Sequence, residues 1–125
     1  MNLIVNLEGA EYLKALGRIK QSARDFLKKT NLIAIRNRKP IYAEKDTEIE
    51  KMQKAKEQSN KNIDDMIDML LTDFPAETYD FIKLFCVFDE GEEAEIKGTD
   101  AIILLLQILT DSNTMDFLFL LTKLG

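Results

Sequence analysis

The fold of this chain is decided by its last third, 74-FPAETYDFIKLFCVFDEGEEAEIKGTDAIILLLQILTDSNTMDFLFLLTKL-124. Three strongly apolar segments follow one another in this stretch, and acidic connectors separate them. Apolar residues that recur every three or four positions place one face of a helix toward a core. We therefore predict three core helices here, to which the upstream part of the chain attaches.

The first of these segments is predicted to be a largely buried, aromatic-rich helix. The pattern i, i+3, i+4, i+7 is met by Phe81, Leu84, Phe85 and Phe88. Pro75 belongs in the first turn, where its missing N–H costs little. Because large aromatic side chains usually fill cores, we interpret them as core residues rather than as a ligand site.

The other two segments are apolar on nearly all sides. Only Gln107 interrupts the run at 101–109, and only Asp116 interrupts the run at 115–121. Neither run approaches the roughly 20 apolar residues that span a bilayer, so we expect no membrane span. Asn113 is placed to cap the last helix. The two segments thus predict a C-terminal apolar helical hairpin packed on the aromatic-rich helix.

A small domain cannot hide all the apolar surface of this hairpin. Contiguous apolar patches larger than a few hundred Å² mark binding or oligomer interfaces in stable proteins. We therefore predict a protein-binding surface made of Ile102, Ile103, Leu105, Leu106, Phe117, Phe119 and Leu120.

Two further helical segments precede the last third. Apolar positions from Ala10 to about Ile35 keep helical spacing and predict one amphipathic helix, with a break at Gly17 as the alternative. From Ala43 to Leu71 there is neither Gly nor Pro. This stretch is either one long helix with a polar waist or two helices that meet near residues 59–62, with Asn62 as the N-cap. We favour the break.

Together these patterns predict an all-α fold of five to six helices in a single domain, 1–125, without a sheet of consequence. A basic N-terminal helix region is expected at residues 1–45, a polar and amphipathic helix at 46–72, and the apolar helical core at 73–125. The alternative at Leu32–Ile35, sequence LIAI, is a strand.

Charge is divided unevenly along the chain. Residues 1–45 carry a net charge of +6 and residues 63–125 a net charge of −11. Such a chain can neutralise itself by folding, or associate head to tail with copies of itself. Lys20, Arg24 and Lys28 form one i, i+4 row and are the candidate electrostatic contact. Without interleaved aromatics or a basic excess overall, we favour a solvated or intersubunit face over a nucleic-acid site.

The residue inventory excludes most catalytic chemistry. There is no histidine, so His-dependent acid–base catalysis, Ser-His and Cys-His pairs and nearly all zinc sites are excluded. Cys86, the single thiol, is interpreted as a small buried hydrophobe in a reducing compartment. Asp64, Asp65 and Asp68 are interpreted as a solvated acidic cluster. We predict no catalytic, cofactor or metal site and no enzyme. Without a secretory signal, a cytoplasmic location is expected.

The order of features in the last third resembles the tail assembly chaperones of long-tailed phages and prophages of Gram-positive bacteria. The resemblance rests on FPAETYDFIKLFCVF, the acidic DEGEEAEI, the apolar AIILLLQIL and, after TDSN, the closing MDFLFLL. It covers about fifty residues well and about a hundred loosely. Residue class carries it, without a catalytic signature.

This resemblance implies an all-helical, non-enzymatic protein in the cytoplasm of the bacterial host cell. Members of the family coat the hydrophobic helices of the tape measure protein until the tail tube polymerises around them. The partner is then the tape measure protein or another helical phage tail protein, held in a helix-in-groove mode. A homo-oligomer is expected as well. Residues 53–62 and the basic first helix depart from the family pattern.

A different class remains as the alternative. It is a small phage or bacterial regulatory or inhibitor protein that binds a protein or a nucleic-acid-associated partner through its basic N-terminal helix. Steep salt dependence of binding to duplex DNA would favour the regulator. Copurification with a long coiled-coil protein would favour the chaperone.

Overall fold

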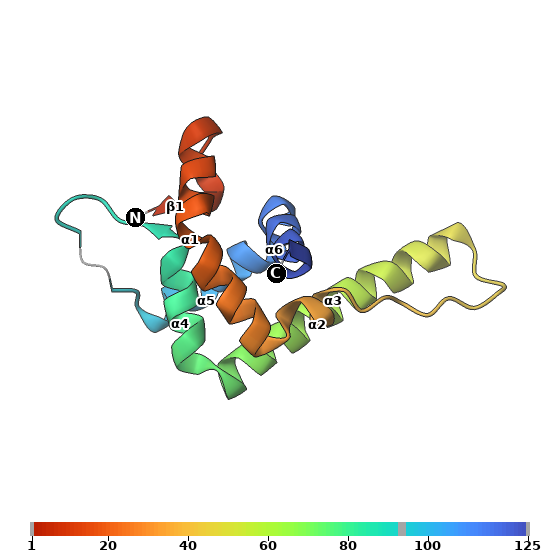
Figure 1. The fold of residues 1–125 in the computed structure, drawn as a ribbon. Helices are drawn as coiled ribbons and strands as arrows, with labels where there is room; N and C mark the ends of the chain where they lie inside the picture. Colours follow the sequence, from red (N-terminus) through yellow and green to blue (C-terminus); the bar gives the residue numbers. More distant parts are fainter. Residues whose placement is uncertain (1, 93–94, 125) are drawn as a thin grey trace.

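The structure, a computed structural model, describes residues 2–92 and 95–124. In order, its elements are β1 (Asn2–Leu3), the 3-10 helix η1 (Ile4–Asn6), α1 (Gly9–Thr30), α2 (Leu32–Arg36), α3 (Glu48–Asp73), α4 (Pro75–Leu84), β2 (Cys86–Val87), α5 (Gly98–Thr110) and α6 (Ser112–Leu124). The predicted all-α class is confirmed for these residues. Most helices gather in one body, from which the outer half of α3 and the segment before it project (Figure 1).

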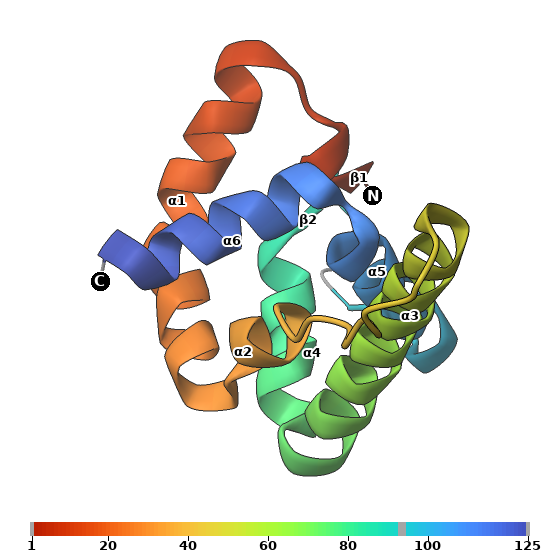
Figure 2. The same cartoon turned by 90° about the vertical axis from the view of Figure 1, so that its right-hand side faces the viewer.

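The core lies where α1, α4, α5 and α6 meet. Helix α1 packs against α4 and α6, and α5 packs against both α4 and α6; Figure 2 shows α6 crossing α1. The rings of Phe26 and Phe81 stack with centroids 4.0 Å apart, and Phe85 tilts against Phe81 at 5.0 Å. Burial of each such side chain stabilises the fold by about 1.5–3 kcal/mol. Phe81 and Phe85 are therefore core residues, as predicted, whereas Phe88 is only half-buried against the core.

The N-terminal helix ends earlier than the sequence predicts. Helix α1 stops at Thr30 because Asn31 adopts a left-handed conformation, with φ of 59°. Asparagine tolerates this conformation better than most residues, and it ends many helices. The turn directs Leu32 and Ile33 of α2 into the core. The prediction of one helix to Ile35 is thus wrong. The strand alternative for this stretch is wrong too, and α1 runs through Gly17 without a break.

Helix α3 is continuous, so the favoured break near residues 59–62 is wrong. Its start is fixed by a capping box. The Glu50 amide donates to Thr47 Oγ1 at 3.1 Å, and the Thr47 amide donates to Glu50 Oε1 at 3.4 Å. Asn62 does not cap a helix but lies buried in the middle of this one.

The aromatic-rich helix is shorter than its apolar pattern. Pro75 occupies the first turn of α4 as predicted, but the helix ends at Leu84 and excludes Phe88. The chain then forms β2, which pairs antiparallel with β1. The Ile4 amide donates to the Phe85 carbonyl at 2.7 Å beside this pairing. The partner strand lies more than eighty residues away in the sequence, so a local pattern cannot predict this end.

The prediction that Asn113 caps the last helix is wrong, because Asp111, two residues earlier, makes the capping hydrogen bonds. Asp111 Oδ2 accepts hydrogen bonds from the amide of Thr114 at 2.9 Å and from its hydroxyl at 2.6 Å. Asn113 lies inside the first turn of α6. A carboxylate accepts more strongly than an amide, and Asp111 ends α5 as it starts α6.

Candidate protein-binding site

The predicted protein-binding residues are divided by the fold between surface and core. Ile102, Ile103 and Leu106 on α5 are 38%, 50% and 38% exposed, and Leu120 on α6 is 55% exposed. Phe117 and Phe119 are half-buried against the core. Leu105, in contrast, is fully buried in the core. It cannot reach a partner in this fold, so its inclusion in the binding surface is corrected.

The exposed residues of α5 form a continuous stripe. Ile102, Leu106 and Thr110 are spaced by four and lie in one row of the helix. Ile103 and the exposed Gln107 flank this row, whereas Leu105 and Ile108 lie on the far side, in the core. No charged residue occurs from Ala101 to Thr110. An uncharged apolar stripe of this kind suits the apolar face of another helix.

The stripe leads to a hollow between the body and the projecting part of α3. The hollow has a volume of about 370 Å³. Its lining includes Ser59, Asn62 and Met66 of α3 together with Leu109, Thr110 and Met115 at the corner between α5 and α6. Thr110 is both the last residue of the α5 row and part of this lining. Stripe and hollow therefore form one surface, the α5 stripe and corner.

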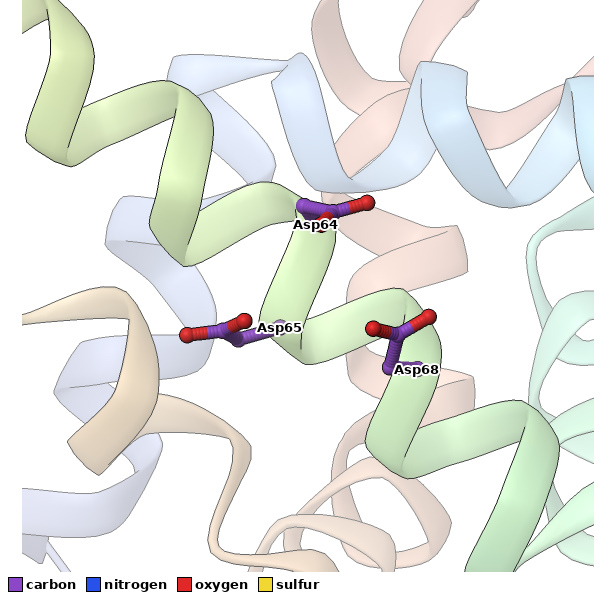
Figure 3. Close-up of side chains that lie close together, drawn as sticks. All are labelled: Asp64, Asp65 and Asp68. Carbon is purple, nitrogen blue, oxygen red and sulfur yellow. The ribbon is translucent and has the colours of Figure 1, made fainter.

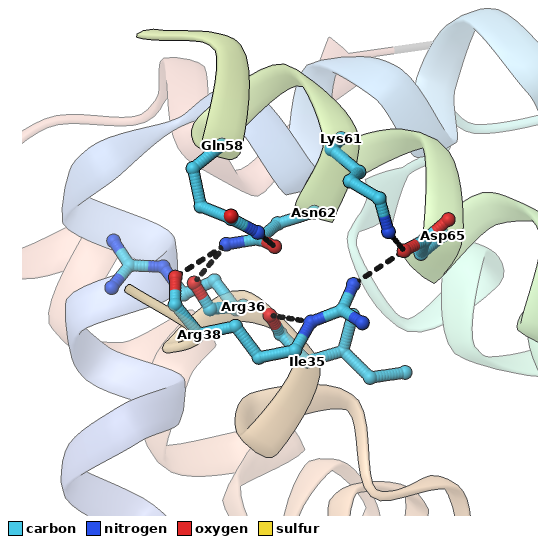
Figure 4. A network of polar contacts seen from close by, with 7 residues as sticks. All are labelled: Ile35, Arg36, Arg38, Gln58, Lys61, Asn62 and Asp65. Carbon is cyan, nitrogen blue, oxygen red and sulfur yellow. Dashed lines mark hydrogen bonds and ion pairs between the residues drawn. The ribbon is translucent and has the colours of Figure 1, made fainter. Parts of the chain in front are cut away.

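The α3 wall of the hollow is held by Asn62, and Figure 4 shows its hydrogen bonds. Asn62 Nδ2 donates to the carbonyls of Arg36 at 3.2 Å and Arg38 at 2.8 Å. Gln58 Nε2 donates to Asn62 Oδ1 at 2.8 Å. The chain after α2 is thereby fastened to the middle of α3. Sequence reasoning missed this role, although an Asn directly before the apolar Ile63 of a helical stripe was the available signal.

The acidic cluster on α3 contributes to the same attachment. Carboxylate oxygens of Asp64, Asp65 and Asp68 lie within 4.8 Å of one another (Figure 3). However, Asp65 Oδ2 already accepts from Arg38 at 2.6 Å and Lys61 at 3.1 Å. The hydrogen bond from Arg38 is the main cause that lowers the pKa of Asp65. Because Asp65 is already paired with the side chains of Arg38 and Lys61, the cluster does not present three free carboxylates. Its ion pair with Arg38 attaches α3 to the segment after α2.

The basic row on α1 is only partly a flat surface. Lys20 and Lys28 are exposed, but Arg24 is half-buried. Its Nε is buried and has no hydrogen-bond partner among the described residues. Arg24 and Lys28 line a hollow of about 410 Å³ beside Thr122 of α6. The row is available for an electrostatic contact, with Arg24 as its recessed member.

The charged halves of the chain neutralise each other only in part. Three ion pairs join them among the described residues: Lys29 with Glu77 at 3.9 Å, Arg36 with Asp116 at 3.8 Å, and Arg38 with Asp65 at 2.6 Å. The first two are long and partly solvated, and such pairs contribute little. Much of the charge therefore stays at the surface, where it can act on partners.

Cys86 lies apart from the α5 stripe and corner. Its side chain is buried, and its Sγ donates to the Ile82 carbonyl at 3.3 Å. Burial raises the pKa of the thiol, which lowers the fraction present as thiolate. The chemistry available to Cys86 is that of a small buried hydrophobe.

Within residues 2–92 and 95–124, no single helix combines the length and apolar composition needed to cross a membrane. The pair α5 and α6 meets that length and composition only when both are taken together, across a bend of 72°.

Comparisons with protein-family models, curated proteins and solved structures found no match to this chain. An account of its function therefore depends on its own residues and surfaces. In the α5 stripe and corner, three large apolar side chains of one helix, Ile102, Ile103 and Leu106, are exposed together.

Proposed function

We propose that this chain is a tail assembly chaperone. It binds hydrophobic helices of a phage tape measure protein, or of another helical tail protein, and keeps them soluble until the tail tube assembles. The observation that carries this proposal is the uncharged α5 stripe, where Ile102, Ile103 and Leu106 are exposed beside the corner hollow. A client helix with apolar residues at i, i+3, i+4 and i+7 can lie along it.

The size of the stripe suits a chaperone that must release its client. Full burial of an Ile or Leu side chain contributes about 1.5–3 kcal/mol, and these three are already half covered. Association itself costs at least about 4 kcal/mol, so one stripe on one client helix gives a weak contact. Several copies of this chain on one long client would together bind it firmly through avidity. Each single contact would still be weak, so the copies could leave the client one at a time.

The proposal is tested with Ile103→Ser combined with Leu106→Ser. The client is a tape measure fragment that contains one hydrophobic helix, and the readouts are its aggregation, measured by light scattering, and coelution in gel filtration. Wild type should suppress aggregation, and the variant should not. Leu13→Ser is the matched control, because Leu13 is 69% exposed on α1 and belongs neither to the α5 stripe nor to the lining of the hollow. The proposal is wrong if wild type fails to bind, or if both variants behave alike.

A regulator that acts through the basic row is the second candidate. The observation in its favour is the recessed Arg24 guanidinium, whose Nε lacks a partner in the described part of the chain. Binding of duplex DNA that weakens steeply with salt, and that Lys20→Glu with Lys28→Glu abolishes, would favour this function. Client binding that both substitutions leave intact would favour the chaperone.

A further inference from the structure

The arm, residues 37–61, carries apolar side chains that the body does not cover. It consists of the segment before α3 and the outer part of α3, and it projects away from the other helices (Figure 1). Ile41, Tyr42, Ile49 and Met52 are 90%, 46%, 70% and 70% exposed. Large apolar side chains concentrated on a projecting element indicate an interface.

The arm is held in place by specific contacts. At its tip, Asp46 Oδ2 accepts from Lys54 Nζ at 2.6 Å and from the Ala43 amide at 2.7 Å, and the Asp46 side chain is only 6% exposed. The Thr47 capping box fixes the start of α3. At its base, Asn62 binds the chain after α2. These contacts order the arm at its tip and at its base, and in this position its apolar residues stay exposed.

The charges of the arm favour a second copy of the same arm. Residues 41–56 contain four acidic and four basic residues, so the tip has no net charge. Over residues 48–56 of α3 the acidic residues come first, at Glu48 and Glu50, and the basic residues follow, at Lys51, Lys54 and Lys56. When two such helices lie side by side and antiparallel, the acidic turn of each faces the basic turn of the other. Their helix dipoles then point in opposite directions, which is the favourable arrangement.

The apolar residues fit the same arrangement. Ile49 and Met52 are three positions apart and lie on one face, on the spacing of a helix–helix seam. If two antiparallel helices cross at Met52, this residue meets its own copy. Glu48 of each copy then lies level with Lys56 of the other, because both are four residues from Met52. Ile49 lies level with the small Ala55.

We propose that two copies of this chain associate through their arms, with the outer parts of α3 antiparallel and crossing at Met52. The contact is isologous, so the same surface serves both copies. It differs from the expected contact between basic and acidic ends. Of the α5 stripe and corner it touches only Ala55, in the wall of the hollow, and it does not rest on the proposed chaperone function.

Sedimentation equilibrium of the full chain over a range of concentrations tests this proposal. Wild type should show a reversible monomer–dimer equilibrium. Ile49→Ser with Met52→Ser should raise the dimer Kd at least about tenfold, because the apolar centre is lost. The control Leu13→Ser removes an equally exposed apolar residue outside the arm and should leave the Kd unchanged. A wild type that is monomeric throughout, or an arm variant that dimerises normally, overturns the proposal.

The antiparallel arrangement has its own test. Lys56→Glu places like charges level with each other and should raise the Kd several-fold, whereas Glu48→Lys combined with Lys56→Glu should restore it. In a Cys86→Ala background, Met52→Cys should form a disulfide-linked dimer on oxidation, and Glu57→Cys, on the opposite face of α3, should not. A parallel or unrelated contact would give no restoration by the charge swap, and that outcome contradicts the proposal.

Discussion

At the scale of single residues, Asn62 connects two segments that are far apart in the sequence. An Asn in the middle of a helix is less favourable than Ala by several tenths of a kcal/mol. Here its amide group makes three hydrogen bonds, two of them to carbonyls of a segment more than twenty residues away. Asn62 thus ties the chain that follows α2 to α3 and fixes the direction in which the arm leaves the body.

Replacing Asn62 by Ala should lower the free energy of unfolding by about 1–3 kcal/mol, because two carbonyls lose their donor. Asn60→Ala is the control, since Asn60 is exposed on the same helix. It should be neutral or slightly stabilising. Urea denaturation measures both. Equal effects of the two substitutions would show that the buried amide contributes nothing specific.

Two aspartates make the contacts of the arm sensitive to acid, Asp46 at its tip and Asp65 near its base. Hydrogen bonds from Lys54 and Arg38 are the main causes that lower the pKa of Asp46 and Asp65 below the ordinary value of 3.8. A lowered folded-state pKa contributes stability above the ordinary pKa, and this contribution is lost as pH falls through the lowered value. Amide hydrogen exchange in residues 43–54 should therefore accelerate below about pH 4, beyond its intrinsic pH dependence. Asp46→Asn should already show the faster exchange at pH 7 and lose much of the additional acid effect.

At the scale of helices and strands, periodicity predicts where helices exist better than where they end. The 3.6-residue pattern identified the helical stretches, and Pro75 marked the start of α4. The ends depend on conformations and partners outside that pattern. Asn31 turns the chain after α1, and β2 pairs with a strand from the opposite end of the sequence. The favoured break in α3 was wrong because a stretch of polar residues can continue a helix when that part of the helix is exposed to solvent.

The candidate site was predictable to a similar degree. Hydropathy alone could not say which side of α5 faces the core, and Leu105 was assigned to the wrong side for that reason. Gln107 is the polar residue that could have decided it, because it lies next to Ile103 and far from Leu105 on the helix. The exposure of Ile49 and Met52 on the arm could not be predicted, since a sequence does not show that a helix leaves the body.

Gly17 offers a direct test of helix propensity in α1. A Cβ at this position would meet nothing within 4 Å, and the backbone is helical. Gly17→Ala should raise the free energy of unfolding by up to about 1 kcal/mol. Gly9 begins the same helix with a positive φ of 57°, so Gly9→Ala should destabilise. Thermal denaturation should shift in opposite directions for the two variants. A shift in the same direction would contradict the backbone argument.

At the scale of the whole molecule, the two proposed surfaces adjoin at the corner hollow, whose lining includes Ala55 and Ser59 of the arm, but their exposed apolar residues lie on different helices. The α5 stripe and corner belongs mainly to the body, and the arm tip projects from it (Figure 1). Effects of substitutions at well-separated sites usually add. Dimerisation through the arms would join two client sites into one particle, which raises the effective concentration of the second site once the first is occupied.

This arrangement predicts that client length distinguishes the two surfaces. A peptide with one hydrophobic helix should bind wild type and the variant Ile49→Ser with Met52→Ser equally well, because each uses a single α5 stripe. A fragment with two such helices should bind wild type tighter by about ten- to a hundredfold, since the dimer engages both. Ile103→Ser with Leu106→Ser should weaken binding of either client and leave the dimer intact.

Isothermal titration calorimetry with both clients measures these affinities, and sedimentation shows whether each variant is a monomer or a dimer. If the arm variant loses the single helix as well, the arm itself contacts the client. If wild type gains nothing from the second helix, the arms do not place two stripes on one client.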